Sequence, residues 1–198
     1  MTLTRKQLKE ATRLRVLDAA GQLFKERGFS ATTIRDIAQV SEVSVGSVIA
    51  VGDKDALLVQ VFESQIEAEH IGRSNTLNRP NVAVGETCGD RLFALVQPFV
   101  SLFVSDFDMA RKYASILVSG THESLLFTKL ADQLIEEFVS VILEDQCTSQ
   151  ANAPAKAQAM YAAYVGVLFT WSTSGSDNLI ALSEKLRNTF AALCDCKE

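Results

Sequence analysis

The sequence predicts an all-α fold in which a headpiece of three helices precedes a larger helical domain, with about nine helices in all. Only three prolines and ten glycines interrupt 198 residues, and alternating Val, Ile and Thr stretches typical of strands are few. Apolar residues instead recur at three- and four-residue spacing behind side chains that favour helix N-termini. The content of 47% apolar and 22% charged residues suits a globular protein.

A long amphipathic helix is expected first, from about Leu8 to Arg27. Lys25 and Arg27 near its end favour the negative pole of the helix, and Gly28 suits a stop just beyond. Its apolar face consists of Ala11, Val16, Leu17, Ala20, Leu23 and Phe24.

A second, short helix should begin at Ile34. Thr33 and Asp36 have the spacing of a capping box, in which the hydroxyl accepts a free backbone N–H and the carboxylate accepts another in return. The segment Ser41–Val43 breaks the apolar pattern as a tight turn does.

Ser44 is the next N-cap candidate, and Val45 to Val51 then form about two helical turns. Gly52 tolerates a left-handed conformation, so it is a suitable stop. Two short helices joined by a tight turn are a helix-turn-helix, whose second helix fits the major groove of DNA. The stretch therefore indicates nucleic acid as the partner class.

Asp53 should cap a fourth helix that runs to about Ile71, and the polar residues from Gly72 to Gly85 predict a long loop. The predicted domains are residues 1–54, the headpiece, and residues 55–198. Five more helices are expected over Glu86–Val104, Asp106–Ser119, Glu123–Gln146, Pro154–Ser172 and Asp177–Leu193.

Several short motifs of the first sixty residues fall in one register. They are Arg15–Ala20, Leu23-Phe24, Gly28-Phe29, Thr33, Asp36–Ala38, Val43–Ser47 and Lys54–Leu58. In this order they resemble the TetR family of bacterial transcriptional regulators. The resemblance implies an all-helical homodimer that binds a palindromic double-stranded operator. It also implies a repressor that a small molecule, bound in the C-terminal domain, releases from DNA. The lack of a membrane-span pattern and of a secretion-signal pattern separately predicts a cytoplasmic location.

The sequence departs from that family at the end of the recognition helix. Family members usually carry an aromatic pattern with a Tyr before the Lys, whereas this chain has Val48 to Lys54 with Ile49 in the Tyr position and one residue fewer. A phenol that reaches a phosphate or packs beside the groove is therefore missing. Either the operator is bound with fewer contacts, or the protein is a ligand-binding or interaction dimer whose headpiece has weak or lost DNA recognition.

The resemblance assigns DNA contacts to seven residues. Val45, Ser47 and Val48 of the recognition helix are expected in the groove, and Arg35 at a base edge or a phosphate. Thr33, Ser44 and Lys54 are expected at phosphates, with Lys54 aided by the N-terminus of the fourth helix. Thr33 has an alternative role as a cap alone.

The charge of the chain is unevenly distributed. Residues 1–54 hold nine Lys and Arg against six Asp and Glu, a balance of +3 in a chain of net charge −5. A basic end attracts the phosphate backbone, although a solvated N-terminal arm gives the same pattern.

The last two expected helices carry apolar stripes that predict a dimer interface. Two copies would form a four-helix bundle, whereas the alternative is that both stripes serve the core of a single chain. The resemblance favours the dimer. The predicted interface residues are Tyr161, Tyr164, Val165, Leu168, Leu179, Leu182, Leu186 and Phe190.

Aromatic residues of the middle helices predict a pocket for a small apolar or aromatic effector, and Pro98 would bend its helix open. Ordinary core packing is the alternative for each of them. The predicted lining residues are Phe93, Phe99, Phe103, Phe107, Met109, Tyr113, Phe127 and Trp171.

Catalysis, cofactors and metals find little support in the sequence. A phosphate-binding glycine loop, a nucleophile elbow and a His-carboxylate constellation are all missing, so we expect no enzyme and no cofactor. Cys88, Cys147, Cys194 and Cys196 lack the paired spacing of a zinc site, so we expect no metal. For the Cys194-Asp-Cys196 pair a frayed tail is expected, and a redox or metal sensor is the alternative. No apolar run is long enough for a membrane span or a secretion signal.

Overall fold

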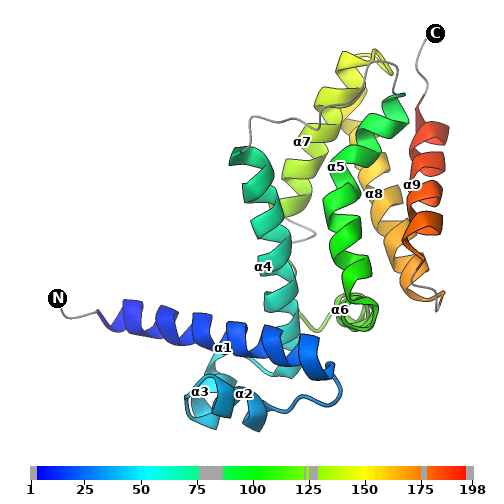
Figure 1. Ribbon diagram of the computed structural model, residues 1–198. Coiled ribbons are helices and arrows are strands. Elements are labelled where there is room, and N and C mark those ends of the chain that lie inside the picture. Colours follow the sequence, from blue (N-terminus) through cyan, green and yellow to red (C-terminus); the bar gives the residue numbers. More distant parts are fainter. Residues whose placement is uncertain (1–3, 76–86, 123, 125–128, 175–177, 195–198) are drawn as a thin grey trace. The chain divides into compact units, whose positions relative to one another are not determined.

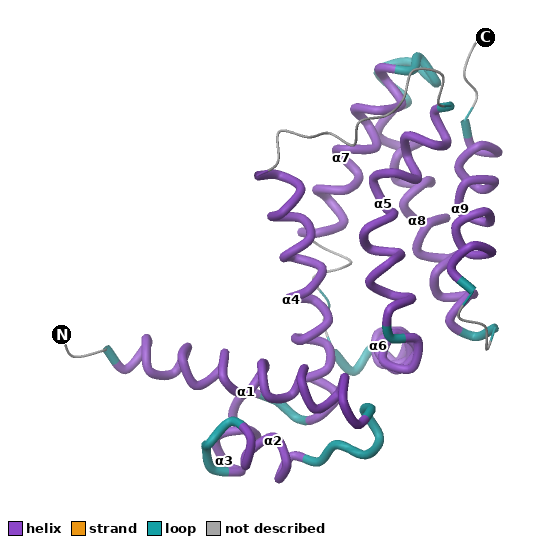
Figure 2. Tube along the Cα trace, viewed as in Figure 1, coloured by secondary structure: helices purple, strands orange, loops and turns teal. Residues whose placement is uncertain are grey.

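The computed structural model describes residues 4–75, 87–122, 124, 129–174 and 178–194 (Figure 1). These residues form nine helices and no strand (Figure 2), which confirms the predicted all-α fold. The helices are α1 Arg5–Arg27, α2 Ile34–Val40, α3 Val45–Val51, α4 Lys54–Asn75, α5 Cys88–Ser105, α6 Phe107–Ser119, α7 Lys129–Glu144, α8 Ala153–Ser172 and α9 Leu179–Leu193.

Local capping explains where the first helices begin. α1 begins at Arg5, before the predicted Leu8, because Thr4 and Gln7 form a capping box that apolar spacing does not indicate. Thr33 and Asp36 form the predicted capping box of α2. Ser44 caps α3 by accepting the backbone N–H of Ser47 at 3.1 Å.

Gly52 ends α3, but not in the predicted left-handed conformation. Its φ of 168° and ψ of 165° describe extended backbone. A Cβ at this position would lie 2.9 Å from the Cβ of Ala56, so the glycine is needed for close approach to α4. The left-handed residue of this region is Glu42, with φ of 53°, in the turn between α2 and α3.

Later boundaries differ from the predictions by a few residues. α4 continues to Asn75, so the predicted loop from Gly72 begins too early, and residues 76–86 lie outside the described part of the chain. The predicted helix over Glu123–Gln146 corresponds to α7, although residues 123 and 125–128 are also outside the described residues.

The chain divides into two compact units. The first, Met1–Gln65 with Asp108–Ser124, contains α1, α2, α3, the first part of α4 and nearly all of α6. The ring of Phe62 on α4 stacks on that of Tyr113 on α6 with centroids 4.6 Å apart. The first unit therefore includes a helix that is remote in sequence from the predicted headpiece of residues 1–54.

The second unit, Ile66–Phe107 with Leu125–Glu198, is built around α5, α7, α8 and α9. These four helices lie side by side (Figure 1). α5 contributes nine buried residues to the core and contains Pro98 within the helix. α5 also comes close to α9, since a Cβ at Gly89 would lie 3.1 Å from the backbone N of Ala191.

Among the described helices, α5 alone is long and apolar enough to cross a membrane by length and composition, and half of it is buried inside the structure. Its apolar residues form the core of the second unit, which accounts for this composition.

Candidate nucleic-acid interface

α3 is an exposed helix fixed by a single buried side chain. Val48 is fully buried, whereas 41% of Val45 and 60% of Ile49 are exposed. Ser44, Gly46 and Ala50 are also exposed and Ser47 is half-buried. The outer surface of α3 therefore presents hydroxyl, methyl and backbone groups, and it carries no charged side chain.

Val48 was predicted to contact DNA, and this prediction is wrong. The side chain is buried within the first unit, and a side chain with no accessible surface cannot contact DNA. Ile49, the next residue, points outward instead. Gly46, Ile49 and Ala50 are also accessible, but the sequence assigned them no DNA contact. In a short helix of mostly apolar residues, the sequence alone does not indicate which residues face solvent.

The turn before α3 holds the two short helices in place. The Val43 N–H donates to the carbonyl of Ala38 at 3.1 Å, and the Ser41 N–H donates to that of Ile37 at 2.9 Å. The buried Ser41 hydroxyl also donates to the Ile37 carbonyl, at 2.5 Å. Backbone groups left over at the end of α2 are thereby satisfied within the turn.

Thr33 is engaged in capping α2. Its hydroxyl oxygen accepts the Asp36 N–H at 3.2 Å and its hydroxyl donates to the Asp36 carboxylate at 2.6 Å, while its own N–H donates to that carboxylate at 2.9 Å. These hydrogen bonds lower the pKa of Asp36 from its ordinary value. Arg35 is exposed beside them.

Lys54, the first residue of α4, lies over an aromatic ring. Its Nζ is 4.3 Å from the ring centroid of Phe29 and donates to the carbonyl of Ser30 at 3.4 Å. Lys112 lies 5.1 Å from the same centroid. Partial burial is the main cause that lowers the pKa of Lys54. The charge of Asp55 raises this pKa, whereas the charge of Lys112 lowers it further. The ammonium group is therefore held near the start of α4, the positive end of that helix.

The predicted dimer stripe lies mostly inside a single chain. Six of its eight residues are buried in the core of the second unit, so a partner chain has no access to them. The alternative, that the stripes serve the core of one chain, describes these six: Tyr161, Tyr164, Leu168, Leu182, Leu186 and Phe190. Only Val165, half-buried, and Leu179, 40% exposed, remain accessible.

The predicted pocket residues belong to both compact units. Met109 and Tyr113 belong to the first unit, and Tyr113 stacks on Phe62. In the second unit, the ring of Phe93 lies under Arg187, whose guanidinium carbon is 4.2 Å from its centroid. Phe107 packs edge-on against Trp171 at 4.9 Å. Phe127 lies outside the described residues.

The two remaining pocket residues, Phe99 and Phe103, line a narrow cavity in the second unit that holds about one water molecule. The ring of His70 on α4 lies 4.6 Å from that of Phe99. Burial raises the pKa of Tyr161 from its ordinary value and keeps its phenol neutral. The full lining is Ile66, His70, Phe99, Phe103, Leu130, Leu134, Tyr161 and Tyr164.

The geometry of the first unit defines a helix-turn-helix protein: a capped short helix, a tight turn and an exposed second helix on a packed scaffold. Residues 16–61 match the family of bacterial regulatory proteins known as the tetR family. Residues 16–61 therefore form a tetR-family helix-turn-helix domain, and the fold of the chain is similar to that of solved TetR-family regulators.

Solved structures share the fold over nearly the whole chain. A TetR transcriptional regulator from Rhodococcus sp. RHA1 is 14% identical, with a TM-score of 0.62, over 93% of this chain and 95% of its own. The repressor FadR of Thermus thermophilus, in complex with lauroyl-CoA, is 21% identical with a TM-score of 0.59, over 91% and 92%. NalD of Pseudomonas aeruginosa, the secondary repressor of the MexAB-OprM multidrug efflux pump, is 20% identical with a TM-score of 0.54, over 94% and 96%. No curated protein sequence matches the chain.

Proposed function

We propose that this protein is a transcriptional repressor that binds a palindromic operator as a homodimer and is released by a small apolar or aromatic effector. The observation that carries the proposal is the exposure of α3: one buried residue anchors the helix, while Val45, Gly46, Ile49 and Ala50 are exposed and available to a groove. On this proposal it acts in the cytoplasm as a regulator and not as a catalyst.

The base contacts belong to the exposed surface of α3. The hydroxyl of Ser47 both donates and accepts hydrogen bonds, while Val45 and Ile49 offer apolar contact to thymine methyl groups. Without a bidentate Arg or Asn on α3, discrimination rests on shape and methyl contacts, so Arg35 of α2 is the charged side chain best placed to add a base or phosphate contact.

Phosphate contacts belong to the ends of helices. Lys54 stands at the start of α4, where its charge adds to the positive end of the helix dipole. Replacing Lys54 with Ala should weaken binding to all DNA sequences alike and reduce the salt slope by about one phosphate contact. Lys129→Ala, at an exposed position of α7, is the matched control and should change neither. An unchanged salt slope for Lys54→Ala would refute the assignment.

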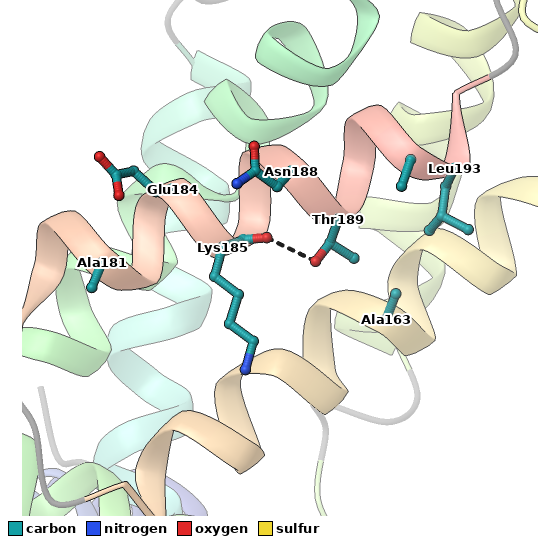
Figure 3. Close-up of a pocket in the computed structure, with 8 residues that line it drawn as sticks. Ala163, Ala181, Glu184, Lys185, Asn188, Thr189 and Leu193 are labelled. Atoms are coloured by element: carbon teal, nitrogen blue, oxygen red, sulfur yellow. Dashed lines mark hydrogen bonds between the residues drawn. The ribbon is translucent and has the colours of Figure 1, made fainter.

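The homodimer is proposed to form through the outer face of α8 and α9 and not through their buried stripes. A shallow groove on this face is lined mainly by short side chains (Figure 3), which allow the helices of a second copy to approach closely. Ile180 on α9 is 71% exposed. The groove is lined by Ala163, Ala181, Glu184, Lys185, Asn188, Thr189, Ala192 and Leu193.

The effector is proposed to bind at the cavity around His70, Phe99 and Phe103. Apolar and aromatic walls with a few polar groups suit an apolar or aromatic molecule, and the phenols of Tyr161 and Tyr164 supply hydrogen bonds. Because the cavity holds only about one water molecule, an effector must separate the helices to enter. Such a movement is a means by which binding reaches the headpiece.

Salt-dependent binding to the DNA beside the protein's own gene tests the function. A repressor should bind its operator at least about a thousandfold more tightly than random duplex of equal length. Equal affinity for both duplexes would favour the second candidate, a ligand-binding dimer without DNA recognition. The shortened segment after Val48, with Ile49 in the Tyr position, is the observation that keeps this candidate in view.

A further inference from the structure

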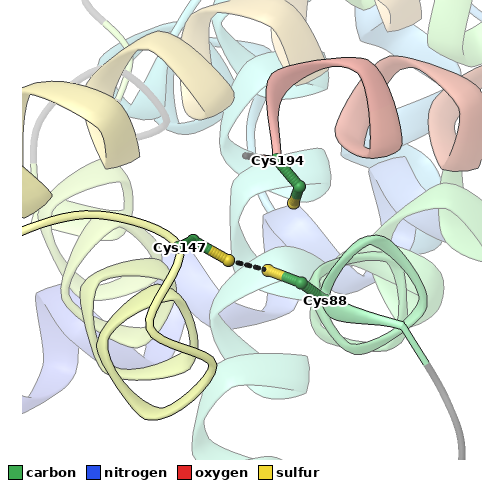
Figure 4. Close-up of side chains that lie close together, drawn as sticks. All are labelled: Cys88, Cys147 and Cys194. Carbon is green, nitrogen blue, oxygen red and sulfur yellow. Dashed lines mark hydrogen bonds between the residues drawn. The ribbon is translucent and has the colours of Figure 1, made fainter. Parts of the chain in front are cut away.

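Three cysteine side chains from distant parts of the sequence meet in the second unit (Figure 4). Cys88 is the first residue of α5, Cys147 follows α7, and Cys194 ends α9. All three sulfur atoms lie within 4.8 Å of one another, and Cys147 Sγ donates a hydrogen bond to Cys88 Sγ at 2.9 Å. The spacing of these cysteines in the sequence predicts no metal site, because the three side chains come together only in the folded chain.

Close helix packing brings Cys194 to Cys88. Gly89, next to Cys88, faces the backbone of Ala191, and any side chain at position 89 would come within 3.1 Å of the Ala191 backbone N. The first turn of α5 thus touches the last turn of α9. That contact fixes the distance between the two cysteines that these turns carry.

Ion pairs from the same turn of α5 hold all three segments. Arg91 pairs with Glu144 and Asp145, which directly precede the segment of Cys147. Asp90 pairs with Arg187 on α9. The three thiols are therefore positioned by contacts that do not involve sulfur, which is how a preorganised site is supported.

The cluster is buried but can be reached from solvent, because Cys88 and Cys147 are buried whereas Cys194 is half-exposed. The α5 N-terminus and the Lys156 ammonium, 2.9 Å from the carbonyl oxygen of Cys147, place positive charge nearby.

We propose that Cys88, Cys147 and Cys194 bind one thiophilic cation, of the class of Zn(II), Cd(II) and Cu(I), through three thiolates. Metal–sulfur bonds of about 2.3 Å at trigonal angles put the sulfurs about 4 Å apart. The present separations, 2.9 Å for one pair and at most 4.8 Å for any pair, lie on either side of that value. On binding, three S–H bonds lose their protons to solvent and three metal–sulfur bonds form, with no change of oxidation state.

A disulfide between Cys88 and Cys147 is the competing use of this cluster. It would employ two thiols and leave the third, Cys194, without a function. A three-ligand site accounts for all of them, and the proposal stands independently of DNA binding.

Cadmium titration of the reduced full-length protein tests the site, with Cd²⁺ as the probe. One Cd²⁺ per chain should bind, with an ultraviolet sulfur-to-metal charge-transfer band and release of about three protons per ion. Proton release is measured by calorimetry in buffers of different ionisation enthalpy. Protein that binds no Cd²⁺ when reduced, and forms a Cys88–Cys147 disulfide when oxidised, would overturn the proposal in favour of a redox pair.

Two serine variants of the C-terminal tail identify the ligands. Cys194→Ser removes a proposed ligand and should weaken Cd²⁺ binding more than about a hundredfold, beyond the loss typical of a residue that only supports a ligand. Cys196→Ser, two residues away in sequence, should bind Cd²⁺ as the natural chain does. Because Cys194 is half-exposed, its serine variant should keep the fold, which circular dichroism checks. Equal Cd²⁺ affinity of both variants, or loss only in Cys196→Ser, overturns the proposal.

Discussion

Adjacent apolar residues on α3 have opposite surroundings and therefore opposite roles. Val48 is fully buried, whereas Ile49 is 60% exposed. Burial of an apolar side chain stabilises the fold, whereas an exposed one on a recognition helix is available to a base methyl group. On the proposed function, the two residues separate stability from DNA binding at neighbouring positions of one helix.

Val48→Ala and Ile49→Ala make this separation measurable. Val48→Ala should lower the free energy of unfolding by about 2 kcal/mol, because it removes two buried methyl groups and leaves a void. Ile49→Ala should change it by less than about 0.5 kcal/mol and should instead weaken operator binding. Denaturant unfolding and DNA titration of both variants test the pair. Equal stability losses would show that α3 is packed differently.

Asp36 links the stability of α2 to pH. Its folded-state pKa is lowered, first by the hydroxyl and then by the backbone N–H of Thr33. A carboxylate with a lowered folded pKa stabilises the fold above its unfolded pKa, and that contribution is lost as pH falls through the folded pKa. Asp36→Asn should therefore reduce stability at neutral pH and flatten the loss of stability below about pH 4. Thermal unfolding of both proteins across pH 2 to 7 measures this pH dependence. If Asp36→Asn lost stability at acidic pH as the natural chain does, the role of the capping box would be contradicted.

Elements whose ends are fixed by local chemistry were predictable from sequence. Thr33, Asp36 and Ser44 lie next to the helices that they cap, so a few neighbouring residues determine where α2 and α3 begin. Which apolar face a helix buries depends on partners far along the chain. The inward orientation of Tyr161 on α8 and Leu186 on α9 depends on such distant packing, and local spacing does not contain it.

The contact between α5 and α9 depends on a glycine, and two Gly→Ala changes test it. Gly89→Ala should lower the free energy of unfolding by about 1–3 kcal/mol, because the added Cβ would lie 3.1 Å from backbone that has no side-chain freedom to yield. Gly166→Ala, in the interior of α8, has nothing within 4 Å and should raise it by about 0.5–1 kcal/mol. Chemical denaturation of the two variants decides between packing and helix propensity. A stability gain for both would show that α5 and α9 are not in tight contact.

At the scale of the whole molecule, sites assembled from remote segments were beyond the reach of the sequence. Cys88 begins α5 and Cys147 lies in the loop after α7, and their sulfurs meet only because the helices pack together. Phe62 and Tyr113 extend the headpiece in the same way. The helix-turn-helix segment was recognisable because its signature is contiguous, whereas the cavity and the thiol cluster are properties of packing.

The proposed dimer face can be separated from other exposed apolar surface by two matched variants. Ile180 on α9 and Val118 on α6 are apolar side chains that are 71% and 74% exposed. Ile180→Glu should dissociate the dimer, because an unpaired carboxylate would be buried where two copies meet. Val118→Glu should leave it intact, which sedimentation equilibrium measures for both. Since a palindromic operator requires two headpieces, Ile180→Glu should also lose operator affinity, while keeping its weak binding to random duplex. A dimer that persists in Ile180→Glu would place the interface elsewhere on the chain.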